Sequence, residues 1–144
     1  MWTIRHYVSG NGSHPFRDWY EALDDNIRAA FDARLRSLRQ QPRNGWSMPH
    51  FRMLHGPCAG LGEIRFKVGR VQYRPLGFFG PGANEFTLLV GAIEKGGALR
   101  PKNACVVALR YVSELERNQM AAHSSQPKAP QRGLGGGYVD DWDA

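Results

Sequence analysis

Two turn signals divide the middle of the chain into three short, strand-like stretches, at about residues 62–68, 71–79 and 85–94. Gly69-Arg70 suits a two-residue hairpin turn, because a type II′ turn prefers glycine at its first position. Gly80-Pro81-Gly82-Ala83-Asn84 is rich in the residues that form turns. Since short connections join antiparallel neighbours, the sequence predicts three antiparallel strands.

The first hairpin has a definite register if Gly69-Arg70 is its turn. Phe66 then lies opposite Tyr73, Lys67 opposite Gln72, and Arg65 opposite Arg74. Because side chains alternate between faces, one face is predicted to meet the helices and the other to be cationic and solvated. The apolar face contains Ile64, Phe66, Val68, Val71 and Tyr73, and the cationic face contains Glu63, Arg65, Lys67, Gln72 and Arg74.

Like charges directly opposite each other in a sheet are destabilising. Two arginines facing each other therefore suggest a site for a polyanion. The alternative is a structural charge ladder in which Glu63 neutralises Arg65 or Arg74. Pro75 cannot donate to a ladder, so we expect an interruption or bulge there.

Helices are expected before and after these strands in the sequence, and an opening strand is expected at about residues 2–8. Pro15 suits a first helical position, which predicts a helix over 16–23. Ile27, Phe31, Leu35 and Leu38 then recur at helical spacing in a second helix. Pro101 opens a final helix near 102–119. The long loop between 40 and 60 is of a kind that is often functional, and we interpret its His50 and His55 as surface histidines.

Composition bounds the class of protein. A length of 144 residues fits one domain, predicted over 1–117, with a flexible tail rich in Gly, Pro and Ser at 118–144. The net charge of +6 suggests an anionic partner, with nucleic acid the first candidate and a solvated basic surface the alternative. No apolar run approaches the ~20 residues of a membrane span, and the N-terminus lacks a secretory signal.

We therefore expect a cytoplasmic protein without membrane association. In that reducing compartment Cys58 and Cys105 are predicted to be free thiols. No Cys/His spacing resembles a zinc site, so neither a metal nor a cofactor is expected.

The predicted cationic face suits RNA cleavage, because RNA carries its own nucleophile in the 2′-hydroxyl. Such a site needs cations for the phosphate charge, a group that takes the 2′-proton and a donor for the leaving 5′-oxygen. Arginine suits the phosphate. The candidates for the proton acceptor are Glu63, Lys67, Lys95 and His55, and the sequence does not choose among them.

Several segments, in this order and spacing, resemble the RelE/ParE superfamily of toxins, and in particular its HigB-like, phage-derived branch. They span roughly residues 2–117 and include Trp46…Pro49, Leu61-Gly62-Glu63-Ile64-Arg65-Phe66, Tyr73-Arg74-Pro75-Leu76-Gly77-Phe78-Phe79, Phe86-Thr87-Leu88-Leu89-Val90-Gly91-Ala92 with Glu94-Lys95, and Pro101…Ala104-Cys105…Ala108. The resemblance implies an α+β fold of the RelE type. Such a fold has a small, antiparallel-rich sheet, two N-terminal helices packed on one face and a C-terminal helix.

The resemblance also implies a function. It points to the toxin of a type II toxin–antitoxin system, a metal-independent endoribonuclease that cleaves mRNA, commonly in the ribosome, and that binds a cognate helix-turn-helix antitoxin. The catalytic residues carried over are Arg65, Arg74, Lys95 and Glu63, and the further RNA contacts are assigned to Lys67, Arg70, Gln72 and His55. No histidine or tyrosine lies beside Lys95, where some relatives keep an acid–base residue.

Two other functions stay open on the same fold, a non-catalytic inhibitor of DNA gyrase of the ParE type and an RNA-binding module without activity. The acidic end of the chain raises a smaller hypothesis. Asp140, Asp141 and Asp143 with Trp142 could fold over the basic face, and a solubilising tail is the alternative.

Overall fold

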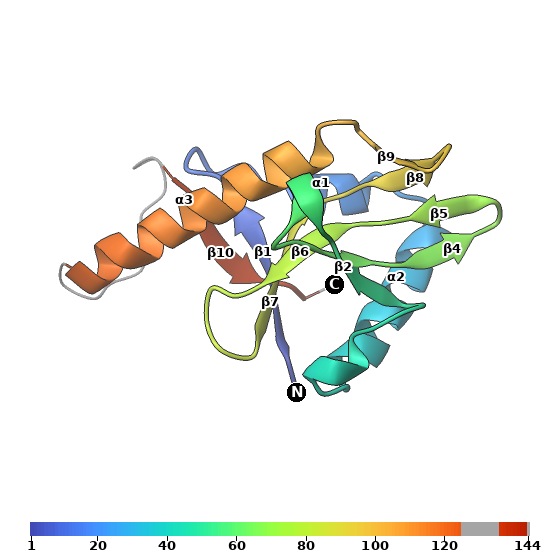
Figure 1. The fold of residues 1–144 in the computed structure, drawn as a ribbon, viewed down its shortest axis with the longest axis horizontal. Helices are drawn as coiled ribbons and strands as arrows, with labels where there is room; N and C mark the ends of the chain where they lie inside the picture. The colour runs from blue at the N-terminus through green and yellow to red at the C-terminus, as the bar shows by residue number, and fades with distance from the viewer. Residues whose placement is uncertain (125–135, 144) are drawn as a thin grey trace.

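The structure is a computed structural model that describes residues 1–124 and 136–143. Its helices are α1 (Pro15–Glu21), α2 (Asp25–Arg39) and α3 (Ala104–Ser124), with short 3₁₀ turns η1 (Arg43–Gly45) and η2 (Gly56–Cys58). Its strands are β1 (Thr3–Val8), β2 (Phe51–Met53), β3 (Gly62–Ile64), β4 (Phe66–Val68), β5 (Val71–Tyr73), β6 (Leu76–Phe79), β7 (Glu85–Val90), β8 (Ile93–Lys95), β9 (Ala98–Arg100) and β10 (Tyr138–Asp141). Figure 1 shows their arrangement, and the α+β class is confirmed.

The described strands form two sheets. One has the order β10-β1-β7-β6-β3-β2 and the other the order β4-β5-β8-β9. Only the β1–β7 pair among them is parallel. Each of the three predicted strands is divided into two, because each bends and continues in the other sheet. The resulting pairs are β3 with β4, β5 with β6, and β7 with β8.

Two of the three bends have a local cause. The first bend lies at Arg65, and the second at Arg74-Pro75, where the proline has no N–H for the ladder. The third lies at Gly91-Ala92, and a Cβ on Gly91 would lie 1.9 Å from Cδ2 of Trp19, so only glycine leaves room for that ring. Strand β9, which the sequence analysis missed, follows the Gly96-Gly97 turn, where both residues have positive φ as a type I′ hairpin turn requires.

The hairpin register is confirmed for Phe66–Tyr73, Lys67–Gln72 and Val68–Val71. It does not extend to Arg65 and Arg74. The N–H of Arg65 donates to the carbonyl of His50 and that of Arg74 to the carbonyl of Ala92, each at 2.9 Å. The two arginines therefore sit at the bends, beyond the ladder in which they were predicted to face each other.

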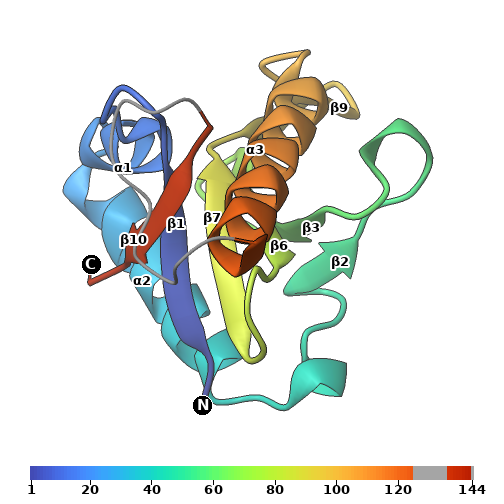
Figure 2. The ribbon, with the colours of Figure 1, turned by 90° about the vertical axis from the view of Figure 1, so that its left-hand side faces the viewer.

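The two faces of the larger sheet bury separate apolar clusters (Figure 2). Helices α1 and α2 cover one face, where Phe16, Phe31 and Leu35 pack with Phe66 and other strand residues. Helix α3 covers the other face through Ala104, Ala108 and Leu115. The N-terminal helices thus share one face, as expected. Of the predicted apolar face of the hairpin, Val71 is the exception at 39% exposed, because it lies beside the turn.

The C-terminal segment belongs to the fold, so the prediction of a flexible tail from residue 118 is wrong for the described residues. Helix α3 continues to Ser124, and β10 pairs with β1, with Val8 opposite Tyr138. Trp142 is 6% exposed and lies in the cluster under α1 and α2. The remainder of the predicted tail, 125–135 and 144, lies outside the described residues.

The hypothesis that this acidic end covers the basic face is also wrong. The carboxylate of Asp141 pairs with Arg5 at 2.7 Å and that of Asp143 with Arg17 at 3.2 Å. Both arginines lie on β1 or α1, near the β10 edge of the larger sheet and away from the hairpin. Local composition concealed this docking, because the glycine-rich stretch before Tyr138 gives no signal for a strand.

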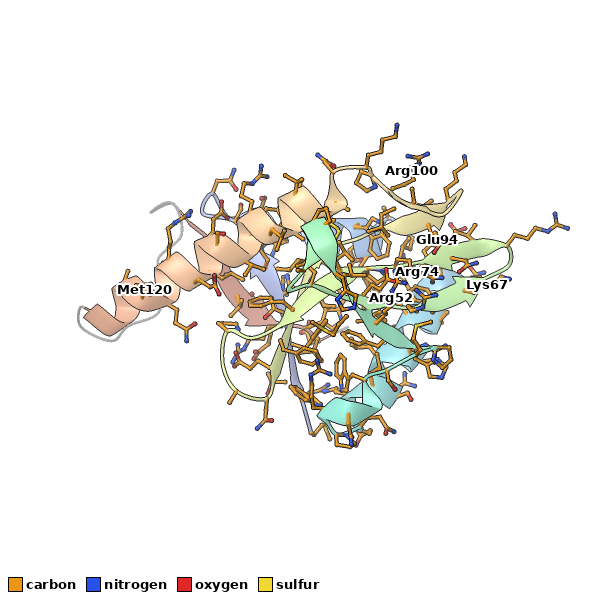
Figure 3. All side chains as sticks on the ribbon, viewed as in Figure 1. Arg52, Lys67, Arg74, Glu94, Arg100 and Met120 are labelled. Atoms are coloured by element: carbon orange, nitrogen blue, oxygen red, sulfur yellow. A yellow bond between two sulfur atoms is a disulfide. The ribbon has the colours of Figure 1, made fainter. Side chains whose placement is uncertain are left out.

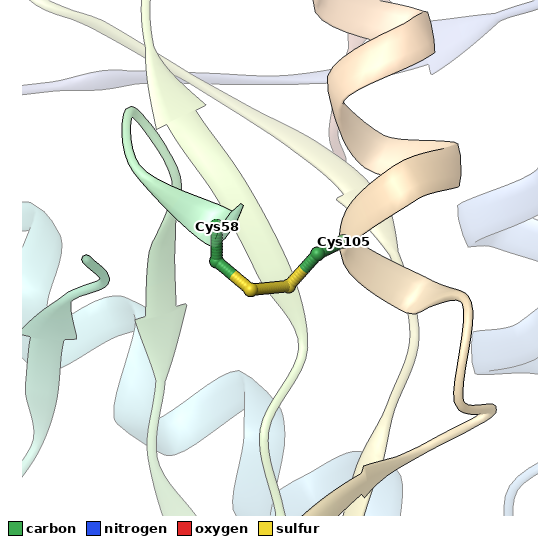
Figure 4. Close-up of a disulfide and its surroundings, with 2 residues drawn as sticks. All are labelled: Cys58 and Cys105. Carbon is green, nitrogen blue, oxygen red and sulfur yellow. A yellow bond between two sulfur atoms is a disulfide. The ribbon is translucent and has the colours of Figure 1, made fainter. Parts of the chain in front are cut away.

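Cys58 and Cys105 form a disulfide that joins η2 to the first turn of α3, with Cα atoms 5.3 Å apart (Figure 4). The prediction of free thiols is therefore wrong. It rested on the expected compartment alone, since the sequence does not tell which loop reaches α3. Among the described helices, none has both the length and the apolar character to cross a bilayer.

Candidate functional site

Charged side chains gather where the strands bend between the two sheets (Figure 3). Lys67, Gln72, Glu94 and Leu99 occupy paired positions across β4, β5, β8 and β9. Residues paired in this way project from the same face of a sheet. The row therefore gives this face a largely polar surface. Arg74 contacts Gln72 and Glu94 of this row, and Arg52 lines a hollow together with Glu94 (Figure 3).

Glu63 is the buried acidic centre of this group, with 2% of its surface exposed. Its Oε1 accepts a 2.6 Å hydrogen bond from Nη1 of Arg65 and lies 3.2 Å from Nε of Arg52. The predicted solvated face is thus wrong at Glu63, and the alternative, in which Glu63 neutralises Arg65, is observed. A buried carboxylate is stable only while such partners remain.

Arg74 is equally buried, at 3% exposed. Its Nη1 donates to the carbonyl of Tyr73 at 3.0 Å and its Nη2 to Oε1 of Gln72. Its Nε lies 3.4 Å from Oε1 of Glu94, within ion-pair range but without hydrogen-bond geometry. Burial first, and then the nearby charge of Arg65, lower the pKa of Arg74, while Glu94 and Glu63 act in the opposite direction.

The Nε atoms of Arg65 and Arg74 share an unusual property. Both are buried and neither has a hydrogen-bond partner in the part of the chain that the structure describes. Buried donors are normally satisfied, and a group left unpaired calls for a physical explanation. Both Nε atoms are covered by protein and are out of reach of a ligand, and the Nε of Arg74 still lies 3.4 Å from Oε1 of Glu94.

Arg65 and Arg74 help to line a hollow of about 280 Å³, which we call the arginine hollow. Its lining residues are Arg34, Pro49, His50, Arg65, Phe66, Lys67, Gln72 and Arg74. Arg34 reaches it from α2 and donates from Nε to the carbonyl of Arg65 at 3.0 Å. Four cations and no carboxylate line this hollow, so its field attracts anions.

A second hollow, of about 360 Å³, lies on the other side of the ion pairs, and we call it the carboxylate hollow. Its lining residues are Arg52, Met53, Leu54, His55, Cys58, Glu63, Glu94, Gly97, Ala98 and Leu99. The ion pairs Arg65–Glu63 and Arg74–Glu94 connect the two hollows. Five cations and two carboxylates line them together, which leaves a net charge of +3 with neutral histidines.

His50 is the functional candidate that the sequence analysis set aside. It lines the arginine hollow, and its carbonyl holds the backbone of Arg65. Burial and then the charge of Arg34 lower the pKa of His50, which favours the neutral imidazole that can accept a proton. No sequence signal identified it, because the path of the loop between residues 40 and 60 is set by tertiary contacts.

The structure brings together six of the eight predicted site residues. Arg65, Arg74, Lys67 and Gln72 line the arginine hollow, and Glu63 and His55 line the carboxylate hollow. Lys95 does not join them, because it follows Glu94 in β8 and so projects from the opposite face. Arg70 is exposed in the hairpin turn and lines neither hollow.

Among the described residues, no group of three or more His, Cys, Asp or Glu side chains is placed to hold a metal ion. Comparisons with protein-family models, with curated proteins and with solved structures find no match for this chain. The function therefore has to be argued from the geometry of the two hollows.

Proposed function

We propose that the chain is an endoribonuclease, the toxin of a type II toxin–antitoxin system in the HigB-like branch of the RelE/ParE superfamily. One observation carries the proposal. Arg65 and Arg74, each held by a carboxylate, line a hollow that contains four cations and no carboxylate, and His50 lines the same hollow. The order of elements, with one strand, two helices, a run of antiparallel strands and a closing helix, supports the same family.

A phosphodiester suits the arginine hollow for electrostatic reasons. Guanidinium groups donate in a planar fork that matches phosphate oxygens. Glu63 and Glu94 hold the guanidinium groups of Arg65 and Arg74 in place before a ligand arrives. Preorganised donors of this kind stabilise the charge that grows on phosphate during its reaction.

The proposed reaction uses the 2′-hydroxyl of RNA. His50 takes its proton, the 2′-oxygen forms a bond to phosphorus, and the bond from phosphorus to the 5′-oxygen breaks. The products are a 2′,3′-cyclic phosphate and a 5′-hydroxyl. We assign the return of a proton to the leaving oxygen to the ammonium of Lys67, which lines the same hollow as His50.

The family proposal brings partners with it. We propose mRNA as the substrate, cleaved free or on the ribosome, and a helix-turn-helix antitoxin as the cognate inhibitor in the cytoplasm. A net charge of +6 supports a nucleic-acid substrate. The chemistry above uses no metal ion, so we expect cleavage to continue in the presence of a chelator.

The direct test is cleavage of a single-stranded RNA and of the same RNA with 2′-deoxyribose throughout. We expect cleavage of the ribose form alone. His50→Ala should lower the rate by roughly 100-fold or more, the usual range for an acid–base group, and Arg65→Ala by roughly 100- to 1,000-fold. Arg117→Ala, at an exposed position on α3, is the matched control and should cleave like the wild type.

Arg65→Ala also removes a partner of the buried Glu63, so its unfolding in urea must be measured beside its activity. His50→Ala leaves the ion pairs intact and keeps the test decisive if Arg65→Ala unfolds. Unchanged cleavage in both variants would refute the proposal. Induction in cells with mapping of RNA 5′ ends separates the alternatives, since DNA damage with intact transcripts indicates a gyrase inhibitor and neither effect indicates an RNA-binding module.

A further inference from the structure

The carboxylate hollow differs in chemistry from the arginine hollow. One wall is apolar and comes from β2 and the residues after it, with Met53, Leu54 and Cys58. Ala98 and Leu99 of β9 add further apolar lining. Its volume of about 360 Å³ is at the small end of the ~300–1,000 Å³ of ligand pockets. Such a space suits a small, flat group with apolar faces.

The carboxylates of this hollow determine which hydrogen-bonding groups a flat ligand needs on its edge. Ionised carboxylates only accept hydrogen bonds. Glu94 has 35% of its side chain exposed, and its Oε1 lies 3.4 Å from Nε of Arg74. A ligand edge with two adjacent N–H donors would pair with this carboxylate as a guanidinium does.

Guanine is the nucleobase with such an edge, because its N1–H and N2–H₂ donors lie side by side. Adenine and cytosine each present one amino donor next to a ring nitrogen that accepts, and that acceptor would face the carboxylate. Uracil presents one N–H between two carbonyl oxygens. A carboxylate therefore favours guanine over the other three bases.

We propose that the carboxylate hollow is a base pocket that takes a guanine of the bound RNA, with Glu94 as the residue that determines specificity. The inference rests on the proposed function, because the phosphate in the arginine hollow places the nucleotide. The two hollows are close enough for one RNA strand. Lys67 and Glu94 are two strand spacings apart in their row, roughly 10 Å.

The test uses pentanucleotides with 2′-O-methyl groups, which lack the nucleophile and cannot be cleaved. The sequences UUGUU, UUIUU, UUAUU, UUCUU and UUUUU differ at the central base, and I is inosine, which is guanine without the N2 amino group. Fluorescence anisotropy gives each Kd. We expect the guanine oligomer to bind roughly 10- to 100-fold tighter than the other four, the range for one bidentate base contact.

Glu94→Gln is close to isosteric with glutamate but places an amide donor against the guanine edge. We expect it to abolish the preference for guanine while UUUUU keeps its affinity for the arginine hollow. Glu116→Gln, at an exposed glutamate of α3, is the matched control and should keep the preference. The thermal midpoints of both variants show whether either change disturbs the fold.

The outcomes separate the two proposals. Binding of every oligomer with equal affinity, or a guanine preference that survives in Glu94→Gln, overturns the base pocket and leaves the proposed function standing. If none of the oligomers binds, the proposed function is refuted, and the proposed base pocket is refuted with it. If the peptide Gly-Gly-Arg-Gly-Gly binds through Glu94 and no base is preferred, the hollow accepts an arginine of a protein partner, which also overturns the inference.

Discussion

Replacing Trp142 by alanine tests whether the C-terminal strand is part of the fold. The indole is 6% exposed, and its ring meets Phe16 and Tyr20 edge to face at centroid distances of 5.3 and 5.0 Å. The guanidinium of Arg17 lies 4.4 Å from the indole centroid. These contacts join β10 to both N-terminal helices, so their loss should be measurable as a loss of global stability.

The magnitude follows from the burial. An aromatic side chain removes ~150–250 Å² from water, which at ~25 cal/mol per Å² stabilises the fold by about 4–6 kcal/mol. The buried Nε1 of Trp142 has no hydrogen-bond partner in the described residues, and an unpaired donor costs about 1–3 kcal/mol. We expect Trp142→Ala to lower the free energy of unfolding by about 3 kcal/mol, within the range measured for such truncations.

Urea unfolding followed by far-ultraviolet circular dichroism measures this loss. Met120→Ala is the matched control, because Met120 is 72% exposed on α3 (Figure 3), and its effect should stay within about 0.5 kcal/mol. A loss of less than about 1 kcal/mol in Trp142→Ala would refute the docking of β10, and the end of the chain would then be the loose tail that composition predicts.

Two further predictions concern covalent and titratable groups. Reduction of the Cys58–Cys105 disulfide, or Cys58→Ser, should lower the free energy of unfolding by about 4 kcal/mol, since the bond spans 47 residues of sequence. Urea midpoints with and without a dithiol measure this loss. Equal midpoints, with both thiols already reactive in the untreated protein, would contradict the prediction. Burial, with the charges of Arg17 and His14, lowers the pKa of the buried His6 from 6.5 to about 4. The unfolded chain then binds the extra proton between these values, so stability should fall by about 3 kcal/mol as the pH drops from 6.5 to 4. His6→Gln should flatten this part of the urea-midpoint profile, and an unchanged slope would be evidence against it.

Local chemistry accounts for much of the fold that could be predicted. The turn at Gly69-Arg70 determined the pairing of Phe66 with Tyr73, and Pro75 the end of the ladder, because turn geometry and the missing N–H act over a few residues. The stripe of Phe31, Leu35 and Leu38 likewise placed α2 on the sheet. The same reasoning brought Glu63, Arg65, Lys67, Gln72 and Arg74 to one site as a group.

The predictions that failed depended on contacts between residues that are distant in the sequence. The sequence did not predict that Glu63 and Arg74 are buried, because their burial follows from the bends of three neighbouring strands. The sequence also did not predict where His50 and Cys58 lie, because contacts with Arg65 and α3 determine the path of the loop that contains them.

The amino-acid sequence by itself determined the strand register near the turns, the apolar stripes of the helices and the positive charge, because these depend on neighbours along the chain. Only the tertiary structure decided that Lys95 points away from the arginines, that His50 joins them, and that Trp142 closes the core. The physical reason is that burial and electrostatic environment are set by residues far apart in sequence, and Trp142 packs against Phe16 across more than one hundred residues.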